Sequence, residues 1–408
     1  MADVLVAAPR SSFARYWAAA AISSFGTAVT AVAMPVLVIQ LLDASPLEVG
    51  VVNAAQFAPY ALLGLIAGAY TDRWRRKPLL VWASIGRALS LGAIPVLWEA
   101  GALQVWMLVI ALVLFGACSV FGFAATQSLL PRLVPRARLV VANARIDQTD
   151  SAAQTLGPAL GGGLVGLLGA PVAILADAIS YLVDAALNTS IEVDERRTDA
   201  RPGNLRAEIA EGLRWMYRHH TLGPLAASTH VWFLANGAAM TVLSLLALRS
   251  LGFSGFTFGL LLAVFGFASL VGASMAPRMG ARIGSGRVII LTRGAYPIAW
   301  LLVLAAPSTG TGDAMLFVGL SLQGLAMGME NANDMGFWQA LTPDGLLGRV
   351  NATRRSVNRT MGAGGALLAG LIVGVAGDRP TLAGVILVFT VAALIAALSP
   401  LRGTRGGD

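Results

Sequence analysis

Long apolar runs, separated by short charged connections, constrain the fold of this chain more than any other feature of its sequence. About 20 consecutive apolar residues make a helix long enough to cross the hydrocarbon core of a bilayer. We predict twelve such helices, over residues 13–40, 47–70, 79–98, 103–126, 143–168, 171–190, 225–247, 255–276, 288–306, 313–335, 351–375 and 380–399. Only 12% of the residues are charged, about half the usual share of a soluble domain. The sequence therefore predicts an all-α polytopic membrane protein.

Basic residues gather in alternate connections between the predicted helices. The basic connections are 73–77, 132–138, 196–218, 278–287 and 349–354. The other connections carry only Arg249 and Arg379, among several acidic residues. Because cytoplasmic connections are enriched in Lys and Arg, we expect both termini and the 191–224 connection on the cytoplasmic side of a cell's inner membrane. The net charge of +8 is then explained by membrane orientation, and no nucleic-acid partner is expected. The first apolar stretch begins near Phe13 and has full membrane length, so we expect no cleavable signal peptide.

The 191–224 connection has two parts. Residues 191–204 are charged and contain a Pro-Gly pair, which is typical of a solvated linker. Residues 205–219 place four apolar side chains on one helical face, namely Leu205, Ile209, Leu213 and Met216. This pattern predicts an amphipathic helix at the inner membrane surface.

An internal repeat defines the architecture. With a shift of 208 residues and no gap, ten positions between 133 and 169 are identical to their counterparts in the second half of the chain. The matched positions include Pro135, Asn143, Gly157 and Gly162. The repeat predicts two six-helix halves in the same orientation, residues 1–190 and 225–408, joined by the 191–224 linker.

A compact charged loop joins the second and third predicted helices. Its sequence places a glycine, an aspartate and three cations at fixed spacing: Gly68, Asp72, Arg73, Arg76 and Lys77. Such charges can be held against neighbouring helix ends at a membrane face. The spacing resembles the signature of the major facilitator superfamily of transporters, from which it departs at Tyr70 and Arg75.

This resemblance implies the major facilitator fold and a gating role for the loop. It places the second helix beside the eleventh, which begins near Asn351. The helix terminus and either Arg354 or Arg355 are then expected to meet Asp72 when the inner gate is shut.

The fifth predicted helix contains a Gly-Pro-x-x-Gly-Gly sequence, formed by Gly157, Pro158, Gly161 and Gly162. Proline kinks a helix and frees a carbonyl, while glycines allow close helix contact. The sequence is similar to a signature of exporters in the superfamily, usually proton-coupled antiporters.

Together with Asn143-Ala144 and the 177–181 segment, this motif resembles the twelve-helix drug/proton antiporter branch. That branch includes multidrug and macrolide efflux pumps and the enterobactin exporter. Many of its members carry an arginine in the fourth helix, and residues 106–126 contain none.

Ionisable residues inside predicted spans are costly in lipid and are therefore functional candidates. The proton-coupling candidates are Glu330, Asp150, Asp147 and Asp334. Glu330 ranks first because its neighbours Asn331 and Asn333 supply no positive charge. Arg87, Arg293, Arg355 and Arg359 are cations at depth, and Asp177 is expected to reach water or cap a helix near an outer end.

Polar and aromatic residues on inward-facing helices are candidates for a substrate cavity. They are Asn53, Gln56, Phe121, Gln127, Trp232, Asn236 and Gln323. Aromatic residues at helical spacing also serve as packing or interface anchors.

The favoured function is export of a bulky amphipathic small molecule by alternating access, driven by protons. The sequence has no nucleophile–base set, phosphate loop or metal-ligand spacing, with one cysteine and three histidines, so no enzyme, cofactor or metal is expected. We expect a monomer in the lipid bilayer. The alternatives are a siderophore or metabolite exporter, or a membrane sensor on the same fold.

Overall fold

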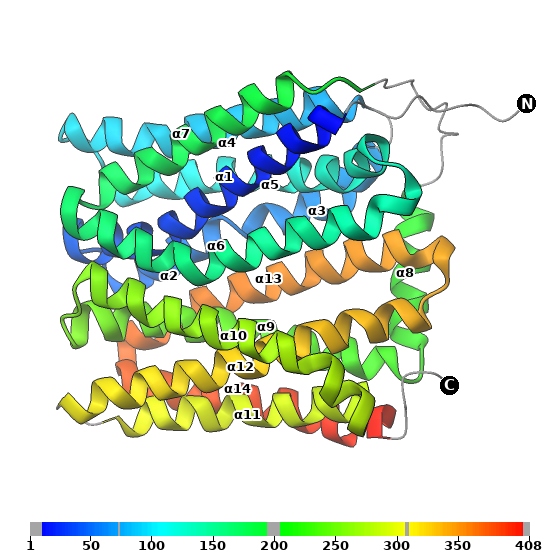
Figure 1. The fold of residues 1–408 in the computed structure, drawn as a ribbon. Coiled ribbons are helices and arrows are strands. Elements are labelled where there is room, and N and C mark those ends of the chain that lie inside the picture. The colour runs from blue at the N-terminus through cyan, green and yellow to red at the C-terminus, as the bar shows by residue number, and fades with distance from the viewer. Residues whose placement is uncertain (1–9, 72–73, 194–204, 307–309, 403–408) are drawn as a thin grey trace, which may run out of the picture.

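The computed structural model describes residues 10–71, 74–193, 205–306 and 310–402 as a bundle of long helices (Figure 1). No strand occurs within these ranges. The helices before the linker are α1 (Arg10–Val36), α2 (Pro46–Ala55), α3 (Ala58–Thr71), α4 (Arg76–Glu99), α5 (Val105–Leu133), α6 (Leu139–Leu168) and α7 (Ala170–Thr189). After the linker helix α8 (Leu205–Arg218) come α9 (Leu222–Leu245), α10 (Gly255–Ile283), α11 (Ser285–Ala305), α12 (Gly310–Leu341), α13 (Asp344–Ala376) and α14 (Asp378–Leu398).

Four short non-α turns lie at the ends of these helices within the described residues. The first and ninth helices continue as π-helical turns, η1 (Leu37–Leu41) and η3 (Leu246–Ser250). Single 3-10 turns precede α6 and follow α14, as η2 (Arg136–Arg138) and η4 (Pro400–Arg402).

Ten helical segments among the described residues are long and apolar enough to cross a membrane. The two further spans that the sequence predicts correspond to the α2–α3 pair and to α6. The first is interrupted at Gln56 and Phe57, which leaves two short helices. The second carries Arg145, Asp147 and Asp150 toward its N-terminal end. The all-helical bundle is thus established, while a count of twelve spans stays a prediction.

The same helix pairs form in both halves of the chain. In the first half, α1 packs against α6 and α7, and α4 packs against α5 and α7. In the second half, α9 packs against α13 and α14, and α11 packs against α12 and α14. In Figure 1 the first half lies above the second. The halves meet along two seams, where α6 packs against α10 and where α2 and α3 pack against α13.

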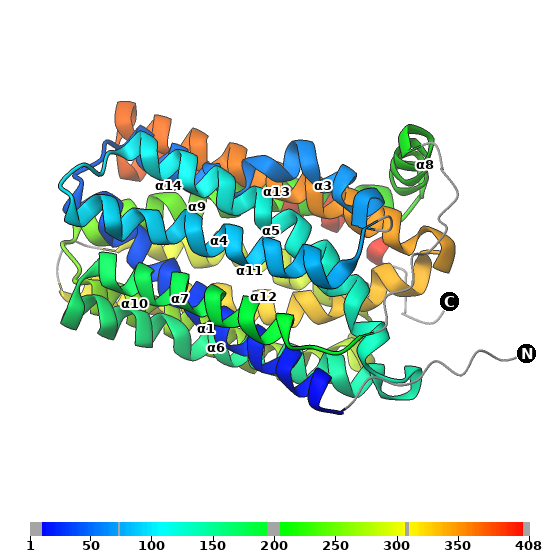
Figure 2. The same ribbon diagram turned by 90° about the horizontal axis from the view of Figure 1, so that it is seen from above.

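The two ends of the bundle differ in charge. One end, here called the basic end, carries residues 74–78 and 134–138, helix α8 and η4; these segments lie on the right in Figures 1 and 2. The opposite end carries residues 42–45, 100–104 and 251–254. Which end faces the cytoplasm is a prediction from charge alone.

Hydrogen bonds join the two halves at the opposite end. The Gln40 amide donates to the carbonyls of Leu248, at 3.3 Å, and Phe253, at 2.9 Å. Arg249 donates to the Ala44 carbonyl at 2.6 Å and lies 3.4 Å from the Asp43 carboxylate. These contacts join the C-terminal turn of the first helix, η1, to that of the ninth helix, η3, at the end of the bundle opposite the basic end.

Candidate transport site between the two halves

The exporter-like motif of α6 lies in the seam with α10. A Cβ atom added to Gly162 would lie 2.9 Å from the Gly255 carbonyl oxygen, and one added to Gly259 would lie 2.9 Å from the Gly162 Cα. Gly157 and Gly161 face α1 instead, against Ala28 and Val29. Pro158 is buried within the same helix. The motif therefore brings three helix backbones into direct contact.

A second close contact lies in the seam of α2 and α13. A Cβ added to Gly370 would lie 2.9 Å from the Gly50 Cα. Gly370 is the counterpart of Gly162 under the 208-residue shift, so the two seams are related by the internal repeat. The sequence predicts close helix contact at the motif without naming α10 as the partner, and it predicts no contact at Gly370, although the repeat pairs the two glycines.

Glu330 is buried but is not remote from positive charge. Its Oε1 lies 2.5 Å from the Nη2 of Arg293 on α11, and its Oε2 accepts a hydrogen bond from Thr292 at 3.4 Å. The ranking of Glu330, which rested on Asn331 and Asn333 supplying no positive charge, left this contact out. It considered neighbours along α12, whereas the contacting cation comes from the adjacent helix.

Arg293 has partners besides Glu330. Its guanidinium donates to the Ser228 carbonyl at 3.2 Å and to the Thr229 hydroxyl at 3.1 Å, both on α9. It also lies over the Trp232 ring at 5.6 Å. One buried arginine thus links α9, α11 and α12.

Asp334 lies one helical turn from Glu330 and is 3.4 Å from the Nη1 of Arg354 on α13. Arg354 also stacks over Trp338, at 4.7 Å from the ring centroid. Arg354 is therefore engaged by an acid of its own half. The other member of the predicted inner gate, Asp72, lies outside the described residues.

Arg355 points into the seam and reaches the first half. Its guanidinium carbon lies 3.2 Å from the ring centroid of Phe123 on α5. One turn further along, Arg359 lies 5.0 Å from the Phe57 ring and 6.0 Å from the Tyr60 ring. Phe57 and Tyr60 flank the interruption between α2 and α3.

The first half also buries an arginine against an acid. Arg87 on α4 lies 4.0 Å from Asp184 on α7, and Ser84 hydrogen-bonds to both side chains. The guanidinium also lies 4.4 Å from the centre of the Tyr181 ring. Sequence reasoning placed Arg87 at depth but did not pair it, because helical spacing within α4 carries no information about α7.

The remaining carboxylates differ in exposure. Asp150 is half-buried and accepts a hydrogen bond from Ser24 on α1 at 2.5 Å, whereas Asp147 is exposed. Asp177 is fully buried and accepts a hydrogen bond from Ser180 at 3.1 Å. It does not reach solvent, contrary to one of the two expectations for it.

The cavity candidates lie in different environments. Asn53 donates to Thr241 across the two halves at 3.1 Å, and Gln323 donates to Asn236 within the second half at 3.2 Å. Trp232 is buried against Tyr296 and Phe389.

Three further cavity candidates lie in the first half. Phe121 stacks on Trp74 with ring centroids 6.3 Å apart. Gln56 lies in the interruption of the second span, and Gln127 is exposed. Of the seven candidates, only the Asn53 amide has a cross-half hydrogen bond among those described.

The charged loop is described in part. Gly68 lies in α3, and Lys77 donates to the Ile191 carbonyl at 2.7 Å, which ties the start of α4 to the linker. Arg76 begins α4. Asp72 and Arg73 lie outside the described residues, so the predicted gate contact stays a prediction.

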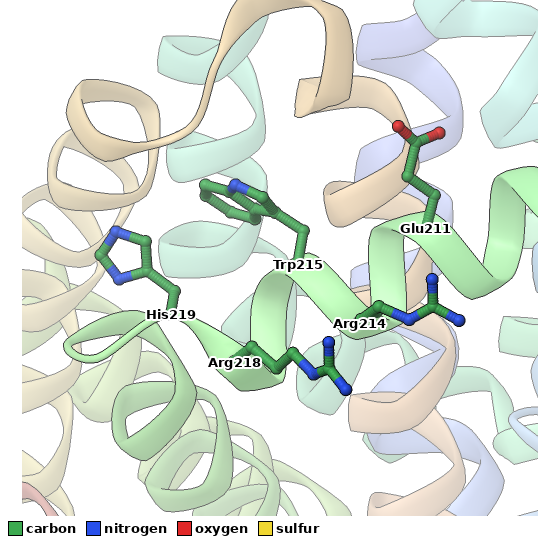
Figure 3. A pocket seen from close by; sticks show the side chains of 5 residues that line it. All are labelled: Glu211, Arg214, Trp215, Arg218 and His219. Carbon is green, nitrogen blue, oxygen red and sulfur yellow. The ribbon is translucent and has the colours of Figure 1, made fainter.

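A surface pocket of about 390 Å³ lies along α8 at the basic end. Figure 3 shows its lining side chains: Glu211, Arg214, Trp215, Arg218 and His219. Arg349 on α13 pairs with Glu211 at 2.5 Å, which fastens α8 to the second half. The helix thus forms as predicted, and it contacts α3 and α13 at the basic end of their seam.

A bundle of long helices with two similarly packed halves and glycine contacts between them agrees with the paired parallel halves of major facilitator transporters. A family model described as a transmembrane secretion effector matches residues 6–406, and the chain belongs to this family of major facilitator transporters. It is therefore a transporter and not an enzyme.

Individual relatives agree with this assignment. The uncharacterized MFS-type transporter y4rN of Sinorhizobium fredii is 29% identical over 291 residues, which cover 71% of this chain and 69% of that protein. The multidrug efflux pump Tap of Mycobacterium tuberculosis is 30% identical over 209 residues, which cover 49% of each chain. The crystal structure of the nucleoside transporter NupG matches with a TM-score of 0.75 over 95% of this chain and 98% of that one. Its 11% identity shows a shared fold alone.

Proposed function

We propose that this chain exports amphipathic small molecules by alternating access, driven by the proton gradient across a cell's inner membrane. The observation that carries the proposal is the position of the exporter-like motif. Gly162 and Gly259 bring the backbones of α6 and α10 into contact in a seam between the halves. A smooth contact of this kind lets one half turn against the other without side chains interlocking. The partial similarity to the pump Tap supports export in particular.

Proton coupling is assigned to Glu330 first and to Asp150 second, with Asp147 and Asp334 as further candidates. Glu330 is buried, and a proton can replace its contact with Arg293 because that guanidinium has other acceptors on α9. Asp150 is half-buried between α1 and α6. The basic connections support a topology with both termini in the cytoplasm, and we propose that the transporter acts as a monomer.

Transport in inverted membrane vesicles tests the proposal. Amphipathic compounds that span anionic, neutral and cationic classes are added with and without an acidic vesicle interior. We expect at least one compound to accumulate only with the gradient, and a protonophore to release it. Vesicles that lack the protein supply the control. Accumulation that is the same with and without the gradient would contradict proton-driven export. Accumulation of polar metabolites alone would favour a metabolite exporter.

A further inference from the structure

Two arginines lie on one face of α13 near its middle. Arg355 and Arg359 are one turn apart, roughly 17 to 23 Å from the start of the helix at 1.5 Å per residue. Both side chains are partly buried. They face the interruption between α2 and α3, and interrupted membrane helices mark substrate sites in transporters.

Aromatic rings of the opposite half receive both guanidinium groups. Arg355 lies over Phe123, and Arg359 lies over Phe57 and near Tyr60. Ring faces attract cations, and the attraction grows when the cation is removed from water. The rings therefore hold the two charges in the seam without neutralising them.

Neither arginine has an acidic partner in the part of the chain that the structure describes. Three other arginines on the long helices each have one: Arg87 lies 4.0 Å from Asp184, Arg293 lies 2.5 Å from Glu330, and Arg354 lies 3.4 Å from Asp334. Two unneutralised cations on one helix turn repel each other and are costly at membrane depth. A ligand that carries negative charge would remove this cost.

We propose that Arg355 and Arg359 bind the acidic group of the transported molecule, which makes the substrate an amphipathic organic anion. The proposal rests on the proposed transport function and specifies its substrate class. A carboxylate or sulfonate would accept hydrogen bonds from both guanidinium groups. The apolar body of the molecule would pack on Phe57, Tyr60 and Phe123. A cationic compound would be repelled by the same two charges.

Binding to the full-length protein in lipid nanodiscs tests this assignment without any gradient. The probes are 4-(pyren-1-yl)butanoate and its neutral N-methylamide, which share the aromatic body and differ in charge. The variants are Arg355→Gln with Arg359→Gln, the charge-keeping Arg359→Lys, and Arg379→Gln as control. Arg379 is exposed at the opposite end, so its replacement removes one positive charge away from the seam.

We expect the wild type to prefer the carboxylate over the amide by at least tenfold. The double variant should bind the carboxylate at least tenfold more weakly and the amide within about twofold of the wild type, because each charged hydrogen bond accounts for roughly a factor of ten or more. Arg359→Lys should keep part of the preference, and Arg379→Gln all of it. Equal weakening of both probes, or no wild-type preference, would overturn the proposal.

Thermal stability gives an independent readout. If the arginines serve a ligand, the double variant without ligand should melt at or above the wild-type temperature, because two uncompensated charges are gone. The carboxylate should then stabilise the wild type and leave the variant unchanged. If the arginines only hold the halves together, the variant melts lower and the inference fails. Selective binding of the anion without gradient-driven accumulation would support the anion site and contradict the proposed proton-driven export.

Discussion

Each half of the protein buries an arginine against an acid on a neighbouring helix. The arginine comes from α4 in the first half and from α11 in the second half. Arg87 meets Asp184, and Arg293 meets Glu330. The second pair is the closer and more deeply enclosed, since Arg293 is 1% exposed and Glu330 is 5% exposed. Removing one partner of such a pair leaves the other charge uncompensated, which costs more than the pair itself contributes.

The variant Glu330→Gln should therefore lower the stability of the folded protein, by about 3–5 kcal/mol for a fully buried pair. Adding Arg293→Gln should restore much of that loss, because both charges are then absent. The melting temperatures of the single and double variants, compared with the wild type, measure the effect. Asp313→Asn, at an exposed position at the start of α12, is the control and should change little.

The same variants separate the structural role of Glu330 from proton coupling. If Glu330 carries the proton, the stable double variant still lacks gradient-driven accumulation. Wild-type transport by the double variant would place coupling elsewhere, and Asp150 would be the next carboxylate to replace.

At the residue scale, the sequence predicted which charges lie at depth and missed how they pair. Glu330 and Arg293 were both located within predicted helices. Their contact depends on how α11 and α12 are rotated about their axes, and the apolar runs do not encode that rotation when all faces are hydrophobic. The exposure of Asp147 and the burial of Asp177 were missed for the same reason.

At the scale of elements, the seam between α6 and α10 depends on residues that lack a side chain. Gly162→Val should reduce transport strongly while leaving the protein folded, because a β-branched side chain would meet the backbone of α10 near Gly255. Gly163→Val is the matched control. It adds the same side chain one position along, where nothing lies within 4 Å of an added Cβ. Initial transport rates, normalised to the amount of protein in the membrane, compare the two.

Equal rates in Gly162→Val and Gly163→Val would show that close contact in this seam is not needed for transport. The internal repeat offers a further comparison. Gly370→Val enters the other seam at the corresponding position and should act as Gly162→Val does.

The start of α9 depends on an unprotonated histidine. The Nδ1 of His219 accepts hydrogen bonds from the backbone N–H groups of Thr221 and Leu222, each at 3.2 Å. Burial and the neighbouring His220 lower the pKa of His219 below its usual value. Because the folded pKa lies below the unfolded one, the stabilisation is present above the unfolded pKa of about 6.5 and is lost as the pH falls toward the folded pKa.

His219→Asn should remove this pH dependence, since an asparagine oxygen can accept the same bonds without titrating. We expect the melting temperature of the wild type to fall more than that of His219→Asn between about pH 7.5 and about pH 5.5. A helix cap is worth about 1 kcal/mol, so the effect is small. His220→Asn should behave as the wild type, and a wild-type slope in His219→Asn would exclude the cap as its source.

Element boundaries could be predicted only where the apolar run and the helix coincide. Residues 103–126 were predicted as a span, whereas α5 continues to Leu133, and α6 begins at Leu139, before the predicted start at 143. The extension of α5 toward the basic end contains Gln127, Ser128 and Arg132, whereas the four residues added at the start of α6, 139–142, are apolar. The interruption at Gln56 and Phe57 was not predicted, although the sequence marks it with Pro59, which has no N–H to donate to the Ala55 carbonyl and therefore favours a break just before it.

At the scale of the whole molecule, the internal repeat predicted the architecture well. Two halves with matching helix pairs follow from a 208-residue shift that is visible in the sequence. The sequence does not reveal the conformational state. In this structure the halves are joined at the opposite end by Gln40 and Arg249, whose partners are backbone carbonyls that no sequence pattern marks.

These contacts make alternating access directly testable without a known substrate. Gln40→Ala with Arg249→Ala removes four hydrogen bonds between the halves at the opposite end, including the one from Arg249 to Asp43. At about 0.5–1.5 kcal/mol each, their loss should shift the conformational equilibrium by roughly tenfold or more. Gln104→Ala is the matched control, because Gln104 lies at the same end but bonds to Trp106 within its own half.

Spin-label distances measured at both ends of the bundle, in a Cys118→Ser background, test the central claim most directly. One pair, at positions 102 and 379, reports on the opposite end, and the other, at positions 137 and 340, reports on the basic end. If the halves rock about the two seams, Gln40→Ala with Arg249→Ala lengthens the 102–379 distance and shortens the 137–340 distance, while Gln104→Ala changes neither. Distances that both lengthen, or a change confined to one end, would contradict alternating access by this protein.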